Sequence, residues 1–251
     1  MIRARLAALS LLLATACAAG AQAPAYTRPK VRAITAFVSL ERASYARQIA
    51  ATLAILREAQ RDFDAAVAEL TRQLTIHARV AETIGTEVAS HYGWTFMGVD
   101  PTPAPLADVS IGAAIEAFTG AKFGAGGTMT AALIITTAVK AVPVRQIGYS
   151  GLMLPVMEDK LLARRWAEGT YDMDGLLAYS AVCATGLDTV PLPGDVSEAQ
   201  LMRIYGDVAS LAWKWHKPLA ARLLPVTGRK AGDQTDFSDP YLFNTSIHPL
   251  P

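Results

Sequence analysis

Acidic side chains in the second half of the chain stand where they could do acid–base chemistry. Glu158 and Asp159 follow an apolar stretch, and Asp188 and Asp195 lie in segments that contain glycine and proline. Loops of this kind carry catalytic groups on a rigid scaffold. Carboxylates there can serve as general acid and base, or can ligate a hard divalent cation. The alternative is structural: Glu158 and Asp159 would stabilise a helix start, and Asp195 would be a turn residue before a cap at Ser197.

A glycine-rich loop at residues 124–128 precedes an apolar helix-forming segment. Its N–H groups could bind the anionic group of a small-molecule ligand. The loop lacks the G-K-[ST] of a P-loop, and Met129 stands where the last glycine of G-x-G-x-x-G would be, so no nucleotide fingerprint is indicated. A flexible connection that lets the next helix pack closely is the alternative. The candidate binding residues are Gly124, Gly126, Gly127 and Thr128.

Basic residues near the end of the chain form a second candidate anion site. Arg222, Arg229 and Lys230 could bind an anion together, and solvated surface charge is the alternative. The whole chain of 251 residues is balanced, with 23 Lys and Arg against 22 Asp and Glu. Such a balance argues against nucleic acid as a partner and leaves a small molecule as the expected ligand.

Cys183 is a further candidate catalytic residue, in a segment that is mostly apolar. A buried structural cysteine is the alternative, since a nucleophile would need a base. The four histidines stand at no metal-ligand spacing, and none neighbours Cys183 in the sequence. A serine hydrolase is not indicated, because residues 148–151 (GYSG) lack one position of the G-x-S-x-G pattern.

The elements that would position these residues alternate between strands and helices, which predicts an α/β fold in a single domain over residues 31–251. From 44 to 91 no proline interrupts a helix-forming pattern. Unbroken patterns beyond about 25 residues are unusual outside coiled coils, so we expect a break near residues 62–67. Strands are predicted at 31–38, 94–99, 147–156 and 219–226, and helices at 108–118, 129–141, 158–167, 173–184 and 197–215.

Residues 1–21 have the parts of a secretory signal peptide: a basic start, an apolar run and small residues at 19–21. A linker follows at 22–30, and Cys17 offers the alternative of a lipoprotein anchor. The sequence therefore predicts an exported protein, periplasmic or secreted. No later segment has eighteen apolar residues in a row, so no transmembrane segment is predicted.

Four stretches occur in an order that resembles the uncharacterised prokaryotic family labelled domain of unknown function 711: residues 107–128, 148–159, 179–195 and 217–244. The resemblance implies a fold like that of pyruvate formate-lyase, an α/β barrel with a site inside, and no established activity. Members of the family are longer, and the extra segment would fall where the helix pattern is too long. An internal deletion near 62–67, and hence an incomplete barrel, is expected.

These observations predict a small-molecule enzyme with a carboxylate-lined acid–base or metal site in an α/β barrel. The alternative is a non-catalytic exported binding protein, or a decayed paralogue that lacks part of the barrel. The sequence does not identify the substrate or the metal, and it leaves open whether the chain forms a homo-oligomer.

Overall fold

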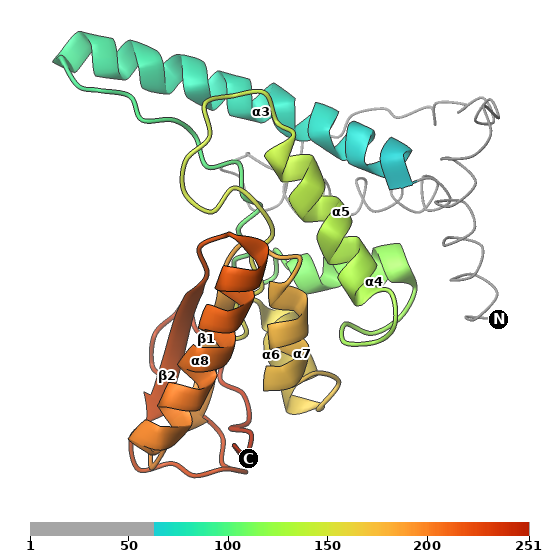
Figure 1. Cartoon of the computed structure of the whole chain (residues 1–251), viewed down its shortest axis with the longest axis vertical. Helices are drawn as coiled ribbons and strands as arrows, with labels where there is room; N and C mark the ends of the chain where they lie inside the picture. Colours follow the sequence, from blue (N-terminus) through green and yellow to red (C-terminus); the bar gives the residue numbers. More distant parts are fainter. Residues whose placement is uncertain (1–62, 251) are drawn as a thin grey trace. The chain divides into compact units, whose positions relative to one another are not determined.

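The computed structural model describes residues 63–250, which belong to one unit of the chain, residues 32–251 (Figure 1). This part is mixed α/β, with six helices and a two-stranded parallel sheet. The helices are α3 (Phe63–Tyr92), α4 (Ile111–Thr119), α5 (Thr128–Lys140), α6 (Lys160–Ala167), α7 (Met173–Ser180) and α8 (Glu198–Trp215). The strands are β1 (Gly186–Pro193) and β2 (Ala220–Val226).

Helices α4 to α8 confirm the five predicted helices, although α7 ends at Ser180 rather than at 184. The starts of α4 and α8 show the local reason. The Ser110 hydroxyl accepts a hydrogen bond from the Ala113 N–H at the start of α4, and Gly120 ends that helix in the left-handed conformation. At the start of α8, Ser197 and Gln200 form a reciprocal capping box.

Two predicted strands do not form as regular strands, and one expected helix break is only partly tested. Helix α3 runs without a break from Phe63 to Tyr92, so none falls within 63–67, while residue 62, where the expected break would begin, lies outside the described residues. The strands predicted at 94–99 and 147–156 are irregular, and contribute only isolated backbone pairs, Val99 with Gln146 and Pro155 with Asp188. The strand predicted at 31–38 lies outside the described residues.

Strand β1 lies parallel to β2, from Gly186 opposite Ala220 to Pro193 opposite Val226, with an irregularity between Leu187 and Val190. All of its residues are buried. The sequence did not predict β1, because its glycine and prolines are typical of turns. The two strands do not close a barrel, so the expected pyruvate formate-lyase-like fold is not confirmed.

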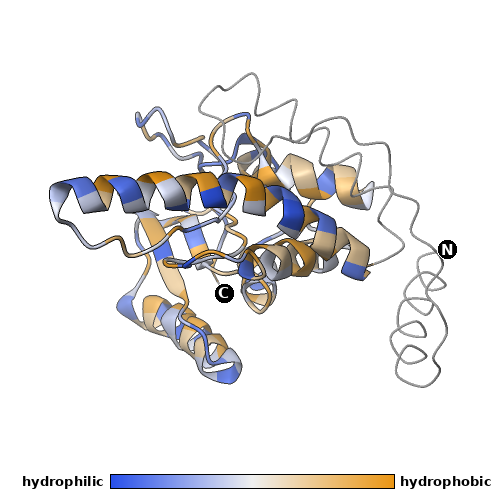
Figure 2. Cartoon of the chain, turned by 90° about the horizontal axis from the view of Figure 1, so that it is seen from above, coloured by the Kyte–Doolittle hydropathy of each residue, from blue (hydrophilic) through white to orange (hydrophobic). Residues whose placement is uncertain are grey.

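The core forms where α4, α5, α6, α7 and β1 meet, around side chains such as Ile115, Phe123 and Leu162. Helix α3 packs on α5 through one face near its N-terminal end, which includes Leu70 and Leu74. Figure 2 shows that hydrophobic and hydrophilic residues alternate along α3. Its other apolar side chains, Ile76, Val80, Ile84 and Val88, are about half exposed.

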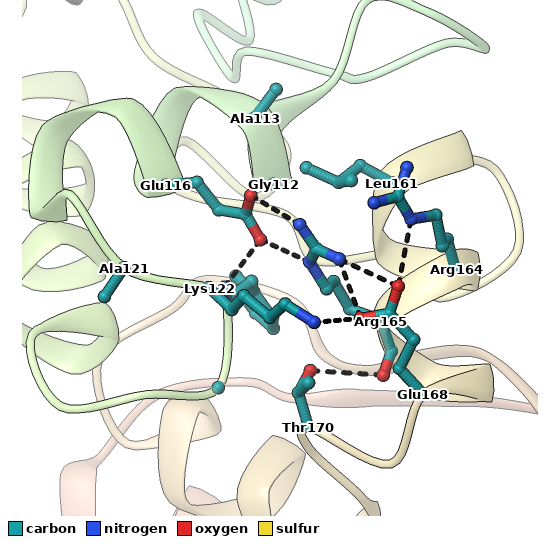
Figure 3. A network of polar contacts seen from close by, with 12 residues as sticks. Gly112, Ala113, Glu116, Ala121, Lys122, Leu161, Arg164, Arg165, Glu168 and Thr170 are labelled. Carbon is teal, nitrogen blue, oxygen red and sulfur yellow. Dashed lines mark hydrogen bonds and ion pairs between the residues drawn. The ribbon is translucent and has the colours of Figure 1, made fainter.

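An ion-pair network holds α4 against α6 (Figure 3). The Arg165 side chain is only 7% exposed, and its guanidinium donates two hydrogen bonds to Glu116, at 2.5 and 2.9 Å. It also binds Glu168 at 2.7 and 2.9 Å, and Lys122 reaches Glu168 at 2.8 Å. No helix among the described residues is long and apolar enough to cross a membrane.

Candidate functional site

Arg222 brings together two of the predicted catalytic carboxylates, Glu158 and Asp188. Its Nη1 lies 2.7 Å from Glu158 Oε1, its Nη2 lies 2.5 Å from Asp188 Oδ1, and its Nε donates to the same oxygen at 2.6 Å. The side chains of Arg222 and Glu158 are 48% and 25% exposed, whereas that of Asp188 is 2% exposed. The cluster therefore has a buried end and a solvent-facing end.

Three elements position this cluster. Asp188 lies on β1 and Arg222 on β2, while Glu158 comes just before α6. The loop before α6 lies against β1: the Val156 N–H donates to the Asp188 carbonyl at 2.9 Å, and the Met157 N–H donates to the Thr189 hydroxyl at 3.1 Å. The pairing of the strands with this loop fixes the spacing of the three charged side chains.

Thr189 adopts a left-handed backbone conformation, with φ of 46°, although it is β-branched and buried. This conformation is rarely populated by such residues and costs of order 1–3 kcal/mol. It coincides with the irregular register of β1 next to Asp188. Residues in such conformations cluster at functional sites. The sequence offers no signal for Thr189, because φ cannot be read from residue types.

The buried carboxylate of Asp188 has one oxygen, Oδ2, without a hydrogen-bond partner. Burial raises the pKa of Asp188, and the neighbouring Arg222 guanidinium offsets only part of that shift. A buried acceptor without a partner is costly unless it gains a proton or a donor. The geometry therefore leaves a hydrogen-bonding position at Asp188 Oδ2 that the described residues do not fill.

The hydrogen bonds of the Asp159 carboxylate go to residues outside this cluster. Its carboxylate is fully buried and caps α6, accepting hydrogen bonds from the Leu161 and Leu162 N–H groups at 2.9 and 3.1 Å. It also accepts from the Ser110 hydroxyl at 2.7 Å and the Gly112 N–H at 3.1 Å, which joins the starts of α4 and α6. These four donors support the structural alternative for Asp159.

Cys183 is 1% exposed, in the turn that follows α7. Its Sγ accepts a weak hydrogen bond from the Gly186 N–H at 3.5 Å. The Lys217 ammonium donates to the carbonyl oxygens of Cys183 and Ala181, at 2.5 and 3.3 Å, and therefore holds the backbone there. A catalytic role for Cys183 stays a prediction, and its burial favours the structural alternative.

The glycine-rich loop uses part of its hydrogen-bonding capacity internally. The Gly124 N–H donates to the Thr128 hydroxyl at 3.1 Å, and the Thr128 N–H donates to the Ala125 carbonyl at 3.2 Å. A side chain at Gly124 would overlap the Thr170 carbonyl, so this glycine permits close packing. Gly127 caps α5 without a side-chain hydrogen bond, and Gly126 is exposed. Anion binding here stays a prediction.

The remaining predicted residues are not brought into the cluster. Arg229 pairs with Asp236 at 2.6 Å, rather than joining Arg222. The Lys230 side chain is exposed, and its backbone N–H donates to Asp233 at 2.8 Å. Asp195 is exposed in the turn between β1 and α8. The expected common anion site of Arg222 and Lys230 is thus not assembled by contacts among the described residues.

A divalent cation does not suit the cluster. Both carboxylates already bind a guanidinium, whose positive charge would repel a second cation. Among residues 63–250, no group of three or more His, Cys, Asp or Glu side chains converges as metal ligands do. The acid–base chemistry of the cluster therefore rests on Glu158, Asp188 and Arg222.

Comparison with known proteins gives the family. Residues 44–238 match the family described as Uncharacterised ACR (DUF711). A UPF0210 protein of Pyrobaculum arsenaticum is 41% identical over 169 residues, which is 65% of this chain and 38% of the relative. One from Desulforudis audaxviator is 34% identical over 190 residues, covering 73% of this chain and 42% of the relative.

The chain spans about two fifths of the length of these curated relatives. The expectation of a signal peptide, an exported protein and a lipoprotein is corrected here, because the similarity to UPF0210 proteins gives those assignments no support. Residues 1–21, the linker at 22–30 and Cys17 lie outside the described residues. The order of the four resembling stretches and the match over residues 44–238 agree: the chain belongs to the uncharacterised DUF711 family, whose curated members are named UPF0210 proteins.

Proposed function

We propose that the chain is a small-molecule enzyme in which Glu158 transfers a proton to or from a polar substrate. The observation that carries this proposal is the junction of Glu158 and Asp188 on Arg222, with one end buried and the other facing solvent. A general acid or base must be within hydrogen-bond reach of its substrate. The partly exposed Glu158 is accessible to a substrate from solvent, whereas Asp188 is only 2% exposed.

Arg222 and Asp188 are positioning residues in this proposal. Asp188 binds two guanidinium nitrogens and so fixes the plane of Arg222. Arg222 in turn directs one oxygen of Glu158, which leaves the other oxygen for substrate. The partly exposed guanidinium can also donate to a substrate oxygen, since it has five N–H groups. Such a pair of donor and acceptor suits hydroxy, oxo or amide compounds.

The experiment begins with a thermal-melting screen of the chain against hydroxy, oxo and amide metabolites, because a specific ligand raises the melting temperature by mass action. Turnover of each stabilising compound is then followed by NMR. We expect Glu158→Gln to keep the fold and the melting temperature without ligand. We expect it to lower turnover by about 10²–10⁴-fold, the usual contribution of general acid–base catalysis.

Glu87→Gln is the matched control, because it makes the same change at an exposed position on α3. It should turn over substrate as the unaltered chain does. Undiminished turnover in Glu158→Gln would contradict the assignment of the catalytic group. Stabilisation by a ligand without any turnover would instead indicate a binding protein; no observation here favours that alternative.

A further inference from the structure

A cavity of about 580 Å³ suggests a second site. Its lining includes none of Glu158, Asp188 and Arg222. Residues of α6, α7, α8, strand β1 and the last part of the tail line it, and it is open to solvent on one side. Cavities of about 300–1,000 Å³ are typical of small-molecule sites. This volume is therefore large enough for an organic molecule with a ring or a short chain.

Much of the lining is apolar and comes from four separate parts of the chain. Leu177 lies on α7, Leu192 on β1, Ile204 on α8 and Leu250 in the tail. These side chains would cover the apolar body of a ligand and exclude water from it. A fully hydrated ion gains nothing from such a lining, so the cavity suits a molecule with a substantial hydrocarbon part.

The charged residues of the lining are mostly acidic. Asp172 and Asp174 come from the start of α7 and Asp207 from α8, against one basic residue, Arg203. No ion pair joins Arg203 to any of these acids among the described residues. The lining therefore keeps a negative charge that is not neutralised from within, and favours a positively charged group.

His248 adds a neutral acceptor to the lining. Its ring stacks on Trp166, with centroids 4.2 Å apart, and its Nε2 lies 2.9 Å from the Trp166 carbonyl oxygen. That oxygen can only accept, so Nε2 carries the proton and Nδ1 is left as an acceptor. Burial lowers the pKa of His248, which favours the neutral ring. A ligand N–H can use Nδ1.

We propose that this cavity binds a primary ammonium attached to an apolar body, with the ammonium near the acidic residues of α7. The acids are not gathered as metal ligands, since no described group of three such side chains converges on one point. An organic cation satisfies the charge, the acceptor and the apolar lining together.

The test titrates the whole chain by calorimetry at pH 7 with three compounds of one shape: 2-phenylethylamine, 2-phenylethanol and 3-phenylpropionate. The amine should bind, and the alcohol and the acid should bind more weakly. Asp174→Asn should weaken amine binding about fivefold, because it removes one attractive charge. Arg203→Gln should strengthen it by a similar factor, because it removes a repulsive one.

Asp174 and Arg203 are exposed, and no hydrogen bond joins either side chain to another described residue. Asp174 lies in the first turn of α7, so Asp174→Asn loses a small interaction with the helix macrodipole, and both variants should melt close to the unaltered chain. Glu87→Gln removes a charge outside the cavity and should leave the affinity unchanged. Leu177→Trp should fill the space and abolish binding. Equal affinity for amine and alcohol overturns the proposal, and so do charge variants that move affinity in the same direction. Phenylalanine binding more tightly than the amine, with that advantage lost in Arg203→Gln, would identify a zwitterion site instead.

Discussion

At the scale of single residues, the difference between Asp159 and Asp188 shows how position decides the role of a buried acid. Both are buried, and burial raises the pKa of each. Asp159 accepts four hydrogen bonds, which compensate its carboxylate for the loss of water. Asp188 shares one oxygen with Arg222 and leaves the other without a partner. The sequence marked both as candidates, because residue type and spacing do not reveal how many donors meet a carboxylate.

The raised pKa of Asp188 predicts a specific dependence of stability on pH. The folded state holds this proton more tightly than the unfolded chain does, so the associated stability is fully present below the ordinary aspartate pKa. It is lost as pH rises through the folded-state pKa. We expect Asp188→Asn to remove part of this decline, with the part due to Asp159 remaining. Urea unfolding at a series of pH values measures it. Glu87→Gln is the control and should keep the decline of the unaltered chain. An Asp188→Asn variant whose unfolding free energy falls with pH as steeply as that of the unaltered chain would contradict the assignment.

At the scale of elements, predictability followed the presence of local signals. The start of α8 was found because Ser197 is a readable cap, and the start of α4, predicted near residue 108, is capped by Ser110. Strand β1 was missed, because its burial comes from packing against distant segments while its prolines indicate turns. The carboxylates of the site were found by type, but their junction on Arg222 depends on pairing between β1 and β2, which no local pattern encodes.

The Arg165 network predicts unequal costs for two similar substitutions. Burial alone would raise the pKa of Glu116, but hydrogen bonds from Arg165 and the Phe123 N–H outweigh it and hold the pKa below its ordinary value. Glu116→Gln leaves a buried guanidinium poorly paired and should cost about 3 kcal/mol of unfolding free energy. Glu168→Gln should cost clearly less, because Glu168 is more exposed. Urea unfolding of both variants tests this, and equal costs would contradict the greater weight given to the Arg165–Glu116 pair.

At the scale of the whole molecule, the described part ends in a tail without helices or strands that is nevertheless bound to α6 and the loop before it. The Thr245 hydroxyl donates to the Ala163 carbonyl at 2.6 Å, and the indole N–H of Trp166 donates to the Ser246 carbonyl at 2.9 Å. The Phe243 N–H donates to the Met157 carbonyl at 2.7 Å, next to Glu158. Ile247 is 1% exposed. The tail is therefore part of the core and supports both proposed sites.

Removal of residues 243–251 should consequently destabilise the entire described fold. Burial of Ile247 alone contributes about 1.5–3 kcal/mol, and Trp166 would lose its cover and its hydrogen-bond partner. We expect the truncated chain to melt at a much lower temperature and to lose the phenylethylamine site, since His248 and Leu250 line it. Tyr241→Ser changes an exposed side chain of the same tail and should melt as the unaltered chain does. A truncated chain that keeps its melting temperature would show that the tail only covers a fold complete without it, and that Glu158 is held by the strands and α6 alone.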